Sequence, residues 1–263
     1  MIFSTDFLLS LIIVAIIVGI SAELMEVQET RMNERFRETY TRDKGATAAD
    51  VLINTPGDPV NWEKLPVSTC RYPGLAVPGK RGVISYEKIM KLRSKPELLE
   101  RAFRGLHVRI VLSPLNDRIS PIIIGDELKG NEIHVFRRTV NCNFLSDYVI
   151  RREECLCPSG HGENWTCMNF RVNDSLDYYL ISEGCSGSFI LDTDCNRSHE
   201  EIKIRSGSLK LNLTGQSVVW IHLHGCGRGV IIAGLPRSGM DCPLKPDYFE
   251  VQPCSLQILI SPC

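Results

Sequence analysis

The feature that most constrains this chain is an apolar run at its N-terminus, from Ile2 to Ala22. From Phe7 onward the run carries no charge, and its only polar side chains are Ser10 and Ser21. Because an α-helix rises about 1.5 Å per residue, a helix of this length spans roughly the 30 Å hydrocarbon layer of a bilayer. No Lys or Arg precedes the run, whereas a secretory signal normally starts with a basic segment. We therefore expect a transmembrane anchor over residues 1–22.

A charged segment follows the anchor and is predicted to continue the same helix to Gly45. It contains no Pro or Gly, and it is rich in Glu, Met, Arg and Gln, which are good helix formers. Four large side chains recur in it at roughly helical spacing, namely Met25, Met32, Phe36 and Tyr40. We expect this helical stem, residues 23–45, to place that apolar stripe against the rest of the protein. The alternative is a separate, solvated stalk.

Two groups of residues flank and follow this helix. Before it, Ser4 is followed by the acid Asp6 and the aromatic Phe7. Behind it, the patterns G-x-P-x-N-W, P-G-L-A and S-x-E-K-I occur in that order, and their key positions are Gly57, Pro59, Asn61, Trp62, Gly74, Leu75 and Lys88. In both respects the chain resembles archaeal type IV pilin-like proteins, which are membrane-anchored surface proteins. The resemblance covers the chain from Ile2 to about Val140.

The resemblance implies a pilus-type or surface protein without catalysis. It assigns assembly to Ser4, Asp6 and Phe7, and it makes the motif residues behind the helix structural. The implied partners are the membrane and other pilin-like subunits, which pack through the N-terminal helix. Without the family, the same motifs are generic turns and caps: Pro56 and Gly57 stop a helix, and Ser85 caps the next one.

Cysteine usage indicates where the body resides. Ten of the eleven cysteines are predicted to form disulfides, namely Cys142, Cys155, Cys157, Cys167, Cys185, Cys195, Cys226, Cys242, Cys254 and Cys263, while Cys70 is the candidate for the one left over. Such density is typical of oxidising compartments. Four N-x-Ser/Thr sequons in the same region predict glycosylation at Asn164, Asn173, Asn196 and Asn212. We therefore expect a single-pass cell-membrane protein with an extracytoplasmic body.

The rest of the pattern predicts an α+β fold. After Gly105 the apolar period changes from helical to alternating, and three strand-like runs complete a pilin-like α+β segment over residues 46–141. Seven further strand-like runs predict a disulfide-rich, β-sandwich-like module over residues 142–263. The clearest expected hairpin joins Ile202 and Ile204 to Leu209 and Leu211 through the turn at 206–207.

The sequence offers few candidates for a catalytic or metal-binding site. On a strand, His222 and His224 would face the same way, so both rings could bind one metal ion, and a Cys226 thiolate could join them. The favoured interpretation is a pair of polar sheet-face histidines, so we predict no metal site, no cofactor and no catalytic residue. A net charge of -1 gives no field that would attract nucleic acid. The alternative function is an anchored surface enzyme or metal-binding protein centred on these two histidines.

Overall fold

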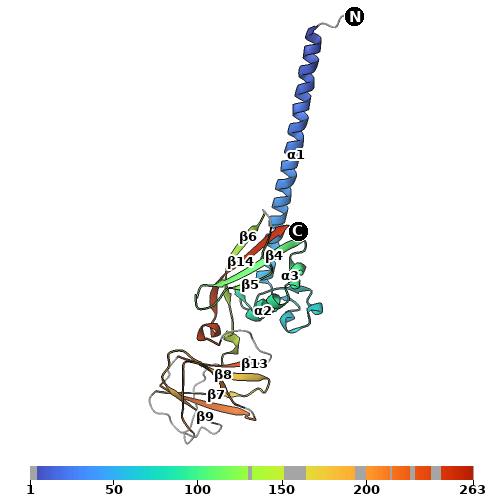
Figure 1. Cartoon of the computed structure of the whole chain (residues 1–263). Coiled ribbons are helices and arrows are strands. Elements are labelled where there is room, and N and C mark those ends of the chain that lie inside the picture. The colour runs from blue at the N-terminus through green and yellow to red at the C-terminus, as the bar shows by residue number, and fades with distance from the viewer. Residues whose placement is uncertain are drawn as a thin grey trace.

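The computed structural model describes residues 5–129, 132–150, 164–192, 200–213, 215–225, 229–237 and 244–262. It has the α+β order expected from the sequence, a long N-terminal helix followed by several β-sheets. The helices are α1 (Thr5–Asn54), α2 (Tyr86–Ser94) and α3 (Glu97–Ala102), with short 3-10 turns η1 (Trp62–Lys64), η2 (Val67–Thr69), η3 (Ser146–Tyr148) and η4 (Pro246–Phe249). Helix α1 projects from one end of an elongated body (Figure 1).

The strands form four sheets. Their bounds are β1 (Gly57–Asp58), β2 (Tyr72–Pro73), β3 (Val83–Ile84), β4 (Leu106–Pro114), β5 (Ile122–Ile124), β6 (His134–Cys142), β7 (Trp165–Arg171), β8 (Leu176–Ser182), β9 (Ser188–Asp192), β10 (Ile202–Lys203), β11 (Gly207–Leu211), β12 (Val218–His224), β13 (Val230–Pro236) and β14 (Gln252–Pro262). The strand orders are β1-β2, β3-β6-β14-β4-β5, β10-β9-β12-β7 and β11-β8-β13. The strands β4, β5, β6 and β14 lie near α1, whereas β7, β8, β9 and β13 lie at the far end of the body (Figure 1).

Helix α1 is a single helix of 50 residues, so the stem does not end at Gly45; the short helical segment predicted to follow, Ala46–Leu52, is part of the same helix. Gly45 is instead the point where the helix approaches the sheet. A Cβ atom added there would lie 1.9 Å from Cδ1 of Ile260 on β14. Thr41 and Ala49, one turn before and one turn after Gly45, are also buried. The glycine therefore permits close helix–sheet packing and does not terminate the helix.

The five-stranded sheet is built around the C-terminal strand β14. Leu256, Ile258 and Ile260 on this strand have no exposed surface, and β14 pairs antiparallel with both β4 and β6. The sequence analysis grouped this strand with residues 142–263, but its sheet neighbours belong to the earlier segment. Alternating apolar residues predict a strand, but they do not specify which strand it pairs with.

The second module consists of two sheets that share a hydrophobic core. The expected hairpin between residues 202 and 211 is wrong, because β10 pairs with β9 in one sheet and β11 pairs with β8 in the other. The backbone N–H of Ile204 donates to the Gly187 carbonyl, and the chain then crosses between the sheets. Ile204 and Leu211 are therefore both buried in the shared core.

The outer face of β8 and β13 joins this module to the first. Ile181, Ala233 and Leu235 belong to the same buried cluster as Tyr248 and Phe249, which precede β14. The two modules therefore pack through a continuous apolar contact.

Two predicted disulfide positions are corrected by the structure. Cys142 and Cys254 are buried free thiols on the neighbouring strands β6 and β14. Cys142 lies opposite Gln252 in the sheet register, so the two cysteines are diagonal neighbours. Burial raises the pKa of both thiols, that of Cys254 to about 11. Cys70 is also a free thiol, whereas Cys185 is disulfide-bonded. The remaining predicted positions, Cys155, Cys157, Cys195, Cys226, Cys242 and Cys263, lie outside the described residues.

Candidate functional site

The N-terminal part of α1 is the first candidate. Every residue from 11 to 40 is exposed, and this helix is long and apolar enough to span a membrane or to act as a signal sequence. Of the predicted assembly residues, Asp6 and Phe7 lie in the first turns of α1, and Ser4 lies outside the described residues.

The apolar stripe of the stem does not pack on the body, so that prediction is wrong. Met25 is 71%, Met32 70%, Phe36 74% and Tyr40 60% exposed. The reason is that the body does not reach this part of the helix: residues 11–40 are exposed on every side, and burial against the body begins only at Thr41. The structure therefore leaves a helical apolar surface uncovered.

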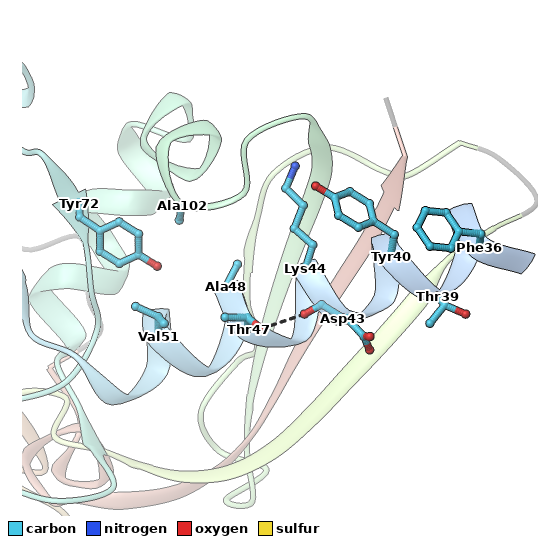
Figure 2. Close-up of a pocket in the computed structure, with 10 residues that line it drawn as sticks. All are labelled: Phe36, Thr39, Tyr40, Asp43, Lys44, Thr47, Ala48, Val51, Tyr72 and Ala102. Atoms are coloured by element: carbon cyan, nitrogen blue, oxygen red, sulfur yellow. Dashed lines mark hydrogen bonds between the residues drawn. The ribbon is translucent and has the colours of Figure 1, made fainter. Parts of the chain in front are cut away.

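A groove begins where this stripe reaches the body. Phe36, Tyr40, Lys44 and Val51 line one side of it along α1, and Tyr72 and Ala102 lie across from them (Figure 2). Its volume is about 630 Å³. The Lys44 ammonium lies 5.9 Å from the centre of the Tyr40 ring. The stripe and the groove form one continuous, largely apolar surface.

The motif residues behind α1 converge into one structural cluster. Trp62 is 1% exposed, and its indole Nε1–H donates to the Gly74 carbonyl at 3.0 Å. A Cβ at Gly74 would lie 2.3 Å from the Thr55 carbonyl oxygen, and one at Gly57 would lie 2.6 Å from the Trp62 ring. These glycines are therefore required for close approach of the backbone.

Lys88 lies at the centre of the same cluster and is 2% exposed. Its ammonium donates to the carbonyls of Pro56 at 2.6 Å, Val60 at 3.0 Å and Ala76 at 3.2 Å. Burial lowers the pKa of Lys88, and the nearby carboxylates of Glu63 and Glu87 oppose that shift. All three ammonium hydrogens have backbone acceptors, so the arrangement fixes loops and leaves no donor for a ligand.

The remaining motif residues lie around this cluster. Leu75 has no exposed surface, the Asp58–Pro59 peptide bond is cis, and Asn61 is the N-cap residue of η1. Ser85 caps α2, as predicted, since its Oγ accepts from the Lys88 N–H at 3.4 Å.

The second module holds a row of buried polar side chains that the sequence analysis did not assemble. His222 on β12 lies directly opposite Cys167 on β7, and its Nδ1 is 3.0 Å from the Cys167 sulfur. Its Nε2 is 3.2 Å from Oδ2 of Asp192 on β9, and neither of these two side chains is exposed. The Cys167 sulfur, which was predicted to form a disulfide, is in hydrogen-bond contact with His222. We call these three residues the buried triad.

His224 faces the same way as His222, as expected for alternate residues of a strand, but it has different partners. Its ring stacks on Trp165 with centroids 4.6 Å apart, and its Nδ1 lies 3.4 Å from Oε1 of Glu201. A hydrogen bond from Ser188 lowers the pKa of Glu201. The two histidines therefore do not converge on one point. Within the described ranges, no group of three His, Cys, Asp or Glu side chains is placed to hold a metal ion.

Asp192 and Glu201 are the partners that the sequence analysis missed. Asp192 lies directly after a strand predicted over Ser188–Leu191 and is the last residue of β9, where alternation places it on the face of Ser188 and Ile190. That signal was present, but the pairing of β9 with β12 was not predictable.

Three predicted glycosylation sites are exposed: Asn164, Asn173 and Asn212. Asn196 lies outside the described residues.

Comparison of the chain with family models, curated proteins and solved structures finds no match. The architecture itself, a long N-terminal apolar helix packed against a β-sheet, is consistent with a pilin-like fold.

Proposed function

We propose that this chain is a membrane-anchored, pilin-like surface protein with an extracytoplasmic body, and that its long helix packs against the helices of other subunits. The observation that carries the proposal is the division of α1 into two parts. Residues 11–40 are all exposed and begin with an uncharged apolar run, whereas the last turns pack against the sheet. An exposed apolar helix is unfavourable in water but stable in a bilayer or in a bundle of like helices.

The stem supports packing against a second copy. Its apolar stripe, Met25 to Tyr40, continues into the groove beside the body. Its first turns carry the acids Glu23, Glu26 and Glu29. Its later turns have a net positive charge, because they carry five bases against three acids, namely Arg31, Arg35, Arg37, Arg42 and Lys44 against Glu34, Glu38 and Asp43. Two stems shifted along their axes would place acidic turns beside basic turns, which favours a staggered arrangement.

The body supports a mechanical role. The two-sheet module lies at the end of the molecule opposite α1 (Figure 1). If α1 is in a membrane, this module is held away from the surface, where it is available for adhesion. The disulfide at Cys185 and the exposed sequons support an oxidising, extracytoplasmic location.

The test uses the full chain in cell membranes. A photo-crosslinking phenylalanine analogue replaces Phe36 on the stripe or, as the matched control, Glu34 on another side of the same stem. We expect retention in carbonate-washed membranes, digestion of the body by external protease, and covalent dimers or larger species from position 36 only. Release by carbonate would contradict anchoring, a protease-resistant body would contradict its location, and equal crosslinking at both positions would contradict the helix interface.

A further inference from the structure

We propose that Asn173 is the residue at which the folded protein accepts an N-linked glycan, and that the fold protects Asn164 and Asn212 from the same modification. The sequence does not separate these three sequons, and all three asparagines are exposed. Because N-x-Ser/Thr acceptors are modified in secreted proteins, this assignment rests on the proposed extracytoplasmic location of the body. Asn196 lies outside the described residues, so the comparison concerns the other three.

The whole sequon of Asn173 lies in an exposed turn. Residues 173–175 connect β7 to β8, and none of the three belongs to either strand. The Asn173 N–H donates to the Tyr178 hydroxyl at 2.7 Å, and the Asn173 carbonyl accepts from the Leu176 N–H at 3.0 Å. These bonds fix the turn on the outside of the module. A transferase can therefore reach the sequon without displacing a strand.

The side chain of Asn173 is held in one orientation by the serine of its own sequon. Its Oδ1 accepts from the Ser175 N–H at 3.0 Å and from the Ser175 hydroxyl at 2.8 Å. Such an Asx turn orients a short amide side chain. Among the described residues, no hydrogen bond engages Nδ2, the nitrogen to which a glycan is attached. The acceptor amide and the hydroxyl that the sequon requires therefore lie side by side on the surface.

The sequon of Asn164 is held in a sheet. Its third residue, Thr166, is on β7 directly opposite Leu223 of β12, and Leu223 is buried in the shared core. Cross-strand partners project from the same face of a sheet, so the Thr166 side chain points toward that core. The Asn164 carbonyl accepts from the Gly225 N–H at 3.1 Å. A transferase could use this sequon only after β7 had separated from β12.

The sequon of Asn212 is held by its neighbours. Leu211 and Leu213, on either side of Asn212, are 6% and 4% exposed and belong to the shared core. Leu213 is the middle residue of the sequon, and it cannot enter an enzyme without exposing apolar surface to water. Exposure of the asparagine is therefore not sufficient, because the backbone beside it must also be free to move.

The attachment reaction is balanced by a glycosyl donor, a sugar linked through its anomeric carbon to a polyprenyl phosphate. A bond forms between Nδ2 of Asn173 and the anomeric carbon, and the bond from that carbon to the phosphate oxygen breaks. Nδ2 loses one proton to the transferase, and nothing is oxidised or reduced. The product is a bulky, solubilising group on the β7–β8 turn.

The experiment incubates the full chain, solubilised in detergent, with a lipid-linked oligosaccharide and an oligosaccharyltransferase that recognises N-x-Ser/Thr. Synthetic peptides that carry the three sequons are the unfolded references, and mass spectrometry measures the modification rate at each asparagine. We expect the rate at Asn173 in the folded chain to match that of its peptide. At Asn164 and Asn212 the rate should be at least about 10-fold below that of the corresponding peptide, because modification there requires local unfolding.

The matched variants change only the sequon hydroxyl at the exposed turn. Ser175→Ala should abolish modification of Asn173, and Ser175→Thr should retain it, with the circular dichroism of both variants unchanged. An unmodified Asn173 in the folded wild type would overturn the proposal, and so would modification of Asn164 and Asn212 as fast as in their peptides.

Glycopeptide mapping of the protein isolated from its native membranes separates this proposal from the proposed function. A glycan at Asn173, with Asn164 and Asn212 bare, is the expected result and supports both. A bare Asn173 in the native protein, together with rapid modification of the purified chain, would contradict the extracytoplasmic location and not the acceptor geometry.

Discussion

The two modules each bury a polar centre, and they satisfy it in different ways. In the first module, Lys88 donates to three backbone carbonyls, which belong to loops 12 to 32 residues earlier in the chain. In the second module, the buried triad joins three side chains from three different strands. A charge enclosed by backbone acceptors is suited to holding a loop, because no donor is left over. The buried triad instead depends on the order of three strands in one sheet, because its side chains meet only there.

The largest expected effect is at the Lys88 centre. Lys88→Met preserves much of the side-chain volume but leaves three carbonyl groups without their donor. Each such group costs about 1–3 kcal/mol when buried, so we expect the free energy of unfolding to fall by about 3–5 kcal/mol. Urea unfolding of the detergent-solubilised full chain measures this loss. Lys95→Met, at an exposed position just beyond α2, is the control. Equal stability of the two variants would show that the ammonium is not needed to hold the loops.

A smaller loss is expected at the triad. Asp192→Asn replaces a buried carboxylate beside His222 with a neutral amide and should lower the free energy of unfolding by about 1–3 kcal/mol. The matched variant Glu201→Gln changes the half-exposed partner of His224, and we expect no measurable change. A stability change at Glu201 as large as that at Asp192 would mean that burial does not separate the two histidine environments.

The two centres also show which structural features the sequence predicts and which it does not. The helix of α1, the cap at Ser85 and the buried Trp62 all follow from local signals, such as apolar periodicity, capping residues and turn formers. Gly57, Gly74 and Lys88 were singled out only as positions of a family motif; that they converge in space was not predicted, and the structure shows the physical reason for each.

Non-local pairing accounts for most of what the sequence missed. The position of β14 at the centre of the first sheet depends on a contact between segments more than a hundred residues apart. The triad has the same origin, because His222 meets Cys167 and Asp192 only through the β7-β12-β9 order. The prediction for the stem failed for a different reason: its apolar stripe is visible in the sequence, but the point along α1 at which the body begins to cover the helix, Thr41, is not.

The smallest expected effect is a change in the pH dependence of stability, caused by Glu87 beside the Lys88 centre. Burial raises the pKa of Glu87, which accepts a hydrogen bond from the Tyr148 hydroxyl beside the Lys88 centre. The folded protein therefore holds the Glu87 proton to higher pH than the unfolded chain does. The resulting stability is complete below the ordinary pKa of 4.5 and is lost as the pH rises through the raised value.

Glu87→Gln is neutral at all pH values and should flatten the decline in stability over that window, measured by urea unfolding across a pH series. Glu97→Gln, an exposed change in the first turn of α3, should retain the wild-type slope. An unchanged slope in Glu87→Gln would mean that the carboxyl is solvated in the folded state. The Lys88 centre would then differ from the triad in having only one buried ionisable group, and its rigidity would rest on the ammonium alone.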